Sequence, residues 1–135
     1  MESEIHWFGE KVRAGANGAI TQYFFEADTY FRFVDRCRAA GIEIPITPGI
    51  MPITNYTQLA RFSARCGARI PAWLEARLAG FGDDGAAIRD YGLDVITALC
   101  EQLLAGGAPG LHFYTLNRAN ATMRIWQRLR SKGLV

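Results

Sequence analysis

Three short apolar stretches of this chain have the length and composition of buried β-strands, and each ends in polar residues. They span residues 19–25, 44–53 and 111–118. Strands this apolar are typical of a parallel sheet that is covered by helices. Because ligands of α/β proteins gather at the carboxyl ends of such strands, three polar strand ends of one kind predict a shared site.

Helical periodicity fills the segments between these stretches. Residues 4–14 form the first predicted helix, and Asp28 is predicted to cap a second helix that ends at Gly41. Thr54 or Asn55 can cap a third helix, which stops at Gly67. Pro71 suits the first turn of a short helix over 72–78, and Asp83 or Asp84 can cap a long one. In the last two helices, the positions expected to face inward are Ile88, Gly92, Val95, Ile96, Leu99, Leu103, Met123, Trp126 and Leu129.

The alternation of strands and helices predicts an α/β fold with a parallel sheet. The prolines within 44–53 argue against a long regular ladder in the second strand. A closed eight-stranded barrel usually needs roughly 250 residues. Since this chain has 135 residues, it cannot close such a barrel alone, and both edges of its sheet should be open.

Composition and charge exclude several classes of protein. The net charge is +2 without a basic block, which gives no case for nucleic acid, and no apolar run approaches the roughly 20 residues of a membrane helix. The acidic start lacks a signal-peptide pattern. Cys37, Cys66 and Cys100 are widely spaced and read as reduced packing residues of a cytoplasmic protein. His6 and His112 lack metal-ligand spacing, so no metal site is expected.

Four side chains near the strand ends are candidates for binding a ligand. Gln22 lies on the first strand, where a bond to nearby backbone explains it as well as a ligand does. Gln58 and Phe62 share one helix face, but spacing alone favours Phe62 in the core and Gln58 in solvent. Arg118 falls in the first turn of the last predicted helix, where a cation opposes the helix dipole. An anionic ligand group and a surface ion pair are the two explanations for Arg118.

The motifs around these residues resemble the bacterial methylenetetrahydrofolate reductase family. The similarity runs from about residue 11 to residue 129 without evident gaps. The matching motifs are AGAN at 14–17, AITQYFF at 19–25, PGIMPI at 48–53, RIPAW at 69–73 and HFYTLNR at 112–118. They resemble, in order, the regions of the sixth and seventh strands and the later motifs of that family.

The resemblance implies a fold, a reaction and roles for the four candidates. The family is a (β/α)8 TIM barrel with FAD at the carboxyl ends of its strands. It passes a hydride from NADH or NADPH through the flavin to 5,10-methylenetetrahydrofolate, giving 5-methyltetrahydrofolate. By position, Gln22 resembles a glutamine that contacts both the folate pterin and the nicotinamide nucleotide. Phe62 resembles an aromatic that stacks on either in turn, and Gln58 and Arg118 resemble further folate contacts.

The chain matches only the last three strands of that barrel, so residues 1–135 are expected to form a single partial domain. The absent first five strands carry most FAD contacts, an acidic residue near the flavin and the glutamate proposed as general acid. No catalytic residue is expected here, and the isolated chain should be inactive. The alternative is a non-catalytic half-barrel that associates with itself as a homo-oligomer or with a complementing amino-terminal half. Another barrel enzyme with a phosphate site is the weakest reading, because no glycine-rich loop follows the late strands.

Overall fold

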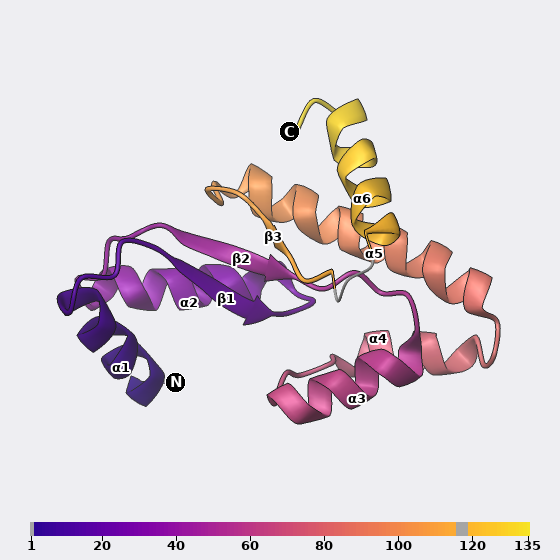
Figure 1. Ribbon diagram of the computed structural model, residues 1–135, viewed down its shortest axis with the longest axis horizontal. Helices are drawn as coiled ribbons and strands as arrows, with labels where there is room; N and C mark the ends of the chain where they lie inside the picture. The colour runs from indigo at the N-terminus through magenta and orange to yellow at the C-terminus, as the bar shows by residue number, and fades with distance from the viewer. Residues whose placement is uncertain (1, 116–118) are drawn as a thin grey trace.

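Three parallel strands form the centre of the structure, in the order in which they occur along the chain (Figure 1). This computed structural model describes residues 2–115 and 119–135. β1 (Ala19–Tyr23) pairs with β2 (Ile46–Ile50), which pairs with β3 (His112–Phe113). The α/β class and the parallel sheet are confirmed, although each strand is shorter than the sequence pattern predicted.

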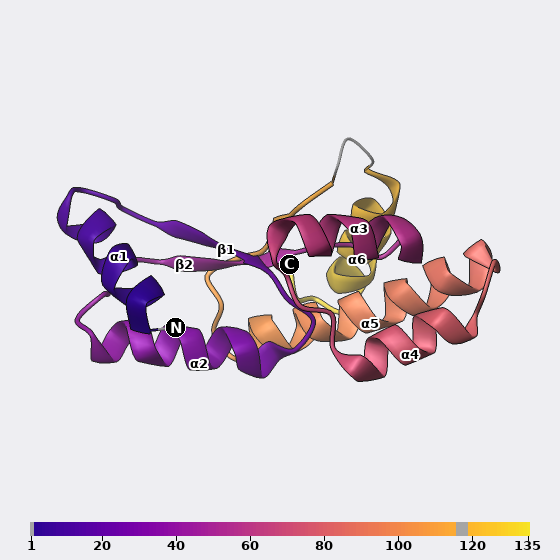
Figure 2. The ribbon, with the colours of Figure 1, turned by 90° about the horizontal axis from the view of Figure 1, so that it is seen from below.

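The described residues contain six helices in addition to this sheet. They are α1 (Glu2–Arg13), α2 (Ala27–Ala39), α3 (Tyr56–Cys66), α4 (Ala72–Gly80), α5 (Gly85–Ala105) and α6 (Asn120–Ser131). Figures 1 and 2 show α2 and α5 on the same face of the sheet, where they contact each other and α5 also contacts β2. Helix α6 packs along α5. Within the described ranges, no helix is both long enough and apolar enough to cross a bilayer.

The helix starts follow from side-chain caps at two of the predicted positions. Asn55 Oδ1 accepts a hydrogen bond from the Gln58 amide at 2.9 Å, and Asp84 Oδ1 accepts one from the Ala87 amide at 3.1 Å. The prediction that Asp28 caps α2 is wrong, because the chain is still extended at Glu26 and the helix begins at Ala27. Asp28 lies instead in the first turn, where its negative charge favours the helix dipole.

The core lies between the sheet and α5. Ile88, Gly92, Ile96, Leu99 and Leu103 of α5 are buried as predicted, and Val95 is half-buried. The prediction fails for two positions of α6. Met123 and Trp126 are 51% and 37% exposed, while Ile125 and Leu129 are buried. The last two are four residues apart and share the buried side of the helix, and Met123 lies on another side. The Trp126 ring instead packs against the guanidinium of Arg130.

Two of the three cysteines are packing residues, as predicted. Cys37 and Cys100 are free and buried, and burial raises the pKa of the Cys100 thiol to about 12. Cys66 is free but exposed at the end of α3, so the prediction that it packs inside is wrong. Its place on the helix end, beyond the last buried turn, explains the difference.

The pairing of β1 with β2 is interrupted opposite Pro48. Proline has no backbone N–H to donate to a ladder, and the register between the two strands shifts between Ile20 and Tyr23. The Thr21 hydroxyl compensates, because its Oγ1 accepts a hydrogen bond from the Gly49 amide at 2.9 Å. The expectation that prolines prevent a regular ladder is therefore confirmed, and a side chain replaces a backbone acceptor.

Tyr114 crosses β2 above Gly49 and joins all three strands. Its hydroxyl donates to the Thr21 carbonyl at 2.9 Å, and its amide donates to the Ile50 carbonyl at 2.8 Å. A methyl group on Gly49 would overlap the Thr21 carbonyl oxygen and come within 2.7 Å of Tyr114 Cε2. Only glycine leaves room for this crossing.

Replacement of Gly49 by alanine should therefore destabilise the fold. Because the added methyl group meets backbone as well as a ring, we expect a loss of about 1–3 kcal/mol or more in the free energy of unfolding. Urea unfolding followed by circular dichroism measures it. Gly80→Ala is the matched control, since a Cβ there has no neighbour within 4 Å. Equal stability of Gly49→Ala and the control would contradict the role given to this glycine.

Candidate functional site

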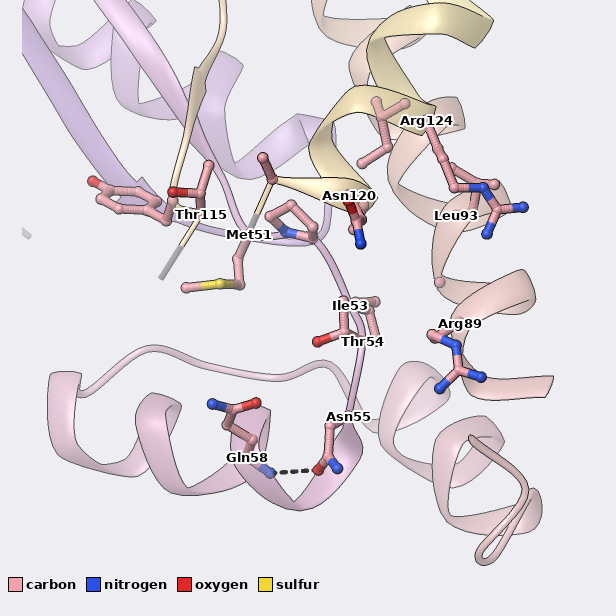
Figure 3. Close-up of a pocket in the computed structure, with 16 residues that line it drawn as sticks. Met51, Ile53, Thr54, Asn55, Gln58, Arg89, Leu93, Thr115, Asn120 and Arg124 are labelled. Atoms are coloured by element: carbon pink, nitrogen blue, oxygen red, sulfur yellow. Dashed lines mark hydrogen bonds between the residues drawn. The ribbon is translucent and has the colours of Figure 1, made fainter. Parts of the chain in front are cut away.

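A pocket of about 540 Å³ opens at the carboxyl ends of β2 and β3, between α3, α5 and α6 (Figure 3). Met51, Ile53, Leu93 and Ile125 form its apolar part. Its polar lining comes from both strand ends and from the three helices, and comprises Thr54, Asn55, Gln58, Arg89, Thr115, Asn120 and Arg124. A few polar groups around an apolar floor are typical of small-molecule sites. The prediction of a polar site at the strand ends thus agrees with this pocket for the second and third strands.

Close packing of α5 against the segment after β2 shapes this pocket. A Cβ on Gly92 would come within 2.7 Å of Ile53 Cβ and 2.8 Å of the Ile53 carbonyl oxygen. The helix can approach the backbone this closely only because Gly92 has no side chain. Asn55 then starts α3 two residues after Ile53. The contact at Gly92 thus holds the segment between β2 and α3 against α5.

Gln58 is the sequence candidate that lines this pocket. Its backbone amide bonds to Asn55 Oδ1, and its side chain is exposed on the first turn of α3, toward the pocket (Figure 3). The prediction that Gln58 is exposed to solvent is confirmed. The exposed amide also lines the pocket, where it can both donate and accept hydrogen bonds to a ligand.

Phe62 lies one turn further along α3 and outside this pocket. It is half-buried and stacks on Tyr23, with ring centroids 6.0 Å apart and planes at 23°. Tyr23 is held in turn by a buried 2.6 Å hydrogen bond between its hydroxyl and Ser63 Oγ. Burial raises the pKa of the Tyr23 hydroxyl, so it stays protonated near neutral pH. One side of Phe62 therefore belongs to the core, as spacing alone suggested, and the ring is held in a fixed position.

Gln22 lies at the far end of α3 from the pocket. Its Nε2 donates to the carbonyl of Cys66 at 2.8 Å, and the residue is exposed. The prediction that the Gln22 side chain bonds to backbone is thus confirmed, although the backbone group belongs to α3 and not to a residue near Gln22 in the sequence. A primary amide has a second donor and a carbonyl acceptor. The bond to Cys66 orients the amide and leaves capacity for a ligand.

Three of the four residues predicted from the sequence therefore lie along α3: Gln58 and Phe62 belong to this helix, and Gln22 is bonded to its last residue. Gln58, Phe62 and the Gln22 partner Cys66 are spaced by four residues along α3, so they share one side of it. With a rise of 1.5 Å per residue, Gln58 and Cys66 are about 12 Å apart along the axis. The arrangement is an extended wall and not a single cavity. The fourth candidate, Arg118, lies outside the described residues.

Sequence reasoning missed Arg89, Asn120 and Arg124 in the pocket wall. No sequence signal singles out the two arginines. Neither has an aspartate or glutamate three or four residues away on its own helix, but the same is true of Arg128, which pairs with Asp94 of α5. The described residues contain no group of three His, Cys, Asp or Glu side chains that could hold a metal ion.

Comparisons with known proteins agree with the resemblance. The family model described as methylenetetrahydrofolate reductase matches residues 1–130. The chain is 42% identical to 5,10-methylenetetrahydrofolate reductase of Escherichia coli over 119 residues, which cover 88% of this chain and 40% of that protein. It is 40% identical to methylenetetrahydrofolate reductase (NADH) 1 of Arabidopsis thaliana, covering 95% of this chain and 22% of the relative. The chain thus spans less than half of the length of either relative.

A solved structure shares the fold at low sequence identity. It is an uncharacterized protein from Clostridium thermocellum, described as binding two copies of 5-methyl-5,6,7,8-tetrahydrofolic acid. The TM-score is 0.64 at 19% identity, and the match covers 99% of this chain and 49% of that one. With a family match over nearly its whole length, this chain belongs to the methylenetetrahydrofolate reductase family.

Proposed function

We propose that this chain supplies the folate and nicotinamide wall of a flavin-dependent 5,10-methylenetetrahydrofolate reductase. The observation that carries the proposal is the position of Gln58. The sequence resemblance singles it out as a folate contact, and its side chain lines the pocket at the carboxyl ends of β2 and β3. Family membership supports the reaction class, NAD(P)H-dependent reduction to 5-methyltetrahydrofolate, in one-carbon metabolism.

The partial TIM barrel is part of this proposal. Strands that are neighbours in sequence are neighbours in the sheet, with no reversal of order, as in a barrel wall. The helices α2 and α5, which both lie on connections between strands, share one face of the sheet. Right-handed crossovers between parallel strands in consecutive order place their helices on one face, as in the wall of a barrel. These features support residues 1–135 as a single partial domain that contributes the last three strands.

Each candidate has a proposed role along the α3 wall. Gln22 offers an amide to a heterocycle with mixed donors and acceptors, which suits the pterin or the nicotinamide. Phe62 offers a ring fixed by Tyr23, on which either planar group stacks in turn. Gln58 bonds the folate further along, toward the pocket. Arg118 is proposed as the fourth contact on the resemblance alone.

The described residues do not form a flavin site by themselves. A diphosphate is usually held by successive backbone amides at a glycine-rich turn before a helix. The charged groups of the pocket are instead two arginine side chains on α5 and α6. The pocket volume of about 540 Å³ suits one ligand of drug size. FAD is therefore assigned mainly to parts of the barrel outside these 135 residues, and no chemical step is assigned to residues 1–135.

The exposed edge strand favours a second candidate, a half-barrel that associates through open edges. Ile20 on β1 is 53% exposed, and the unpaired edge of β1 offers free backbone groups to another strand. The occupant is either a second copy of the chain or a complementing amino-terminal half. In both cases the apolar side chain of Ile20 would become covered.

Replacement of Phe62 by leucine should weaken binding of 5-methyltetrahydrofolate to the chain. The change keeps an apolar group beside Tyr23 and removes the stacking face, so we expect a loss of about fivefold to tenfold in affinity. Calorimetric titration measures it. Phe33→Leu is the matched control, because Phe33 stacks on Phe8 between α2 and α1, away from α3. Equal affinity of the Phe62→Leu variant and the control would argue against the wall.

The isolated chain should bind little FAD and oxidise NADH slowly or not at all. Co-expression with a chain that carries the missing strands should restore a bound flavin spectrum and folate-dependent NADH oxidation. Absorbance of the purified proteins at flavin wavelengths and a steady-state assay measure both. If the isolated chain copurifies with stoichiometric FAD and turns over, the proposal of a partial site is wrong.

Replacement of Ile20 by lysine should reduce any self-association of the chain, because a charge on an edge strand opposes pairing. Light scattering after size exclusion measures the mass of the wild-type chain and of the variant. Met123→Lys is the control for added charge, because Met123 lies on α6 and is 51% exposed. A wild-type chain that remains monomeric at high concentration would contradict self-association and leave the complementing half as the occupant.

A further inference from the structure

The connection between α1 and β1 contains the dipeptide Asn17-Gly18, the one place in the chain where a glycine follows an asparagine. Residues 16–18 belong to neither a helix nor a strand, and both members of the dipeptide are exposed. Figures 1 and 2 show this connection at the amino-terminal end of β1, far from α3. The dipeptide lies outside the wall along α3, and the proposed function gives it no role.

The hydrogen bonds of this connection stop before Asn17 and resume after Gly18. Before the dipeptide, the Ala16 amide donates to a carbonyl of α1 at 3.2 Å. After it, the Ala19 amide donates to the Pro45 carbonyl at 3.0 Å. Among the described residues, neither the Asn17 side chain nor the Gly18 amide forms a hydrogen bond. The side-chain carbonyl carbon of Asn17 and the backbone nitrogen of Gly18 are therefore free to approach each other.

We infer that Asn17 is a site of spontaneous deamidation, a modification that does not depend on the proposed function. The Gly18 nitrogen attacks the side-chain carbonyl carbon of Asn17 and closes a five-membered imide. The bond from this carbon to the side-chain nitrogen breaks, and that nitrogen leaves as ammonia with the proton of the Gly18 amide. Because position 18 has no Cβ, nothing crowds the attacking nitrogen.

Water completes the reaction by opening the imide in one of two ways. Cleavage of the newly formed bond gives aspartate, and cleavage of the original peptide bond gives isoaspartate, in which the backbone runs through the side chain. In both cases one water is consumed and one ammonia is released, with no oxidation or reduction. The products carry a carboxylate where Asn17 has a neutral amide.

The two other asparagines in the described residues are held in ways that oppose this reaction. Asn55 Oδ1 accepts a hydrogen bond from the Gln58 amide at 2.9 Å, and the next residue, Tyr56, carries a bulky side chain. Asn120 and Ala121 both lie in α6. Helical torsion angles hold the nitrogen of the next residue away from an asparagine side chain. The structure therefore singles out Asn17.

Both products would disturb the start of the sheet. Isoaspartate adds one carbon atom to the backbone two residues before Ala19, which pairs with Ile46 at the beginning of the β1–β2 ladder. Aspartate places a negative charge just beyond the carboxyl end of α1, where the helix dipole is also negative. We expect both changes to lower the stability of the fold, and isoaspartate to lower it more.

Ageing of the purified 135-residue chain in mildly alkaline buffer tests the inference. Tryptic peptides are then analysed by mass spectrometry, after chromatography that separates the aspartate and isoaspartate forms. Peptide 14–32 contains Asn17 as its only asparagine. Peptide 39–61 contains only Asn55 and is the internal control. We expect peptide 14–32 to convert to both products while peptide 39–61 remains unchanged. Equal conversion of the two peptides would overturn the inference.

Gly18→Ala is the matched variant, because it keeps Asn17 and adds a group beside the attacking nitrogen. The added Cβ would meet the Pro45 carbonyl oxygen at 3.7 Å, an ordinary contact, so the variant should fold. We expect the conversion rate of peptide 14–32 to fall about tenfold. An unchanged rate in the variant would contradict attack by the Gly18 nitrogen.

Ageing of the same chain unfolded in urea tests the contribution of the structure. Because the connection is exposed and its dipeptide is not hydrogen-bonded, we expect Asn17 to convert at similar rates in the folded and the unfolded chain. A folded chain that converts Asn17 about tenfold more slowly than the unfolded chain would overturn the inference, since the fold would then protect this site.

Urea unfolding of fresh and aged protein measures the effect on the sheet. Asn17→Gln is the control, because its longer side chain does not form the five-membered imide. We expect the urea midpoint of the aged wild-type chain to fall as isoaspartate accumulates, and that of the aged variant to stay at its fresh value. A modified wild-type chain with an unchanged midpoint would overturn the effect assigned to the start of β1.

Discussion

The crossing of Tyr114 over Gly49 is the contact on which the sheet and the pocket both depend. β3 has only two residues in its ladder, so its backbone pairing with β2 is brief. Tyr114 extends that pairing through its amide to Ile50 and reaches across β2 to Thr21 with its hydroxyl. A hydrogen bond between strands that are not neighbours is possible only because position 49 has no side chain.

This constraint sets the position of the pocket. Tyr114 and Thr115 line it directly after β3, and Met51 to Asn55 line it directly after β2. Any shift of β3 along β2 would separate these two groups. The close approach of α5 at Gly92 holds the other side, because Ile53 lies against the helix backbone. Two glycines therefore place the ends of two strands and one helix around the same space, while Phe62 and Gln22 are placed by Tyr23, Ser63 and Cys66.

The sequence predicts the element types well because they depend on local patterns. Helix α5 shows this, since its apolar spacing and the cap at Asp84 are local properties of the chain. The failures concern tertiary contacts. Spacing alone cannot tell that Ile125 is buried and Trp126 is partly exposed, because both are large apolar residues of one helix. Nor can it show that the amide of Gln22 bonds to Cys66, which is 44 residues away.

The candidate site divides in the same way. Gln58 and Phe62 could be proposed from their spacing on one helix, and the resemblance raised their weight. The structure shows that only Gln58 lines the pocket, whereas Phe62 stacks on Tyr23 outside it. That difference depends on a tertiary contact and is not visible in the sequence. Arg89 and Arg124 come from helices that meet only in the fold. Local sequence does not mark these arginines either, because Arg128 has no acidic residue three or four positions away and still pairs with Asp94 of α5.

The chemistry of the wall changes along α3 in a way that favours one orientation of an elongated ligand. At the β1 end, a neutral amide and a fixed aromatic ring suit a planar heterocycle. At the pocket end lie two arginines and the start of α6. A neutral ring placed there would leave these positive charges without an anionic partner. The reverse orientation would place carboxylates beside Phe62 and far from these cations. Along α3 the groups therefore change from a neutral amide and an aromatic ring at Gln22 and Phe62 to guanidinium groups at the pocket end.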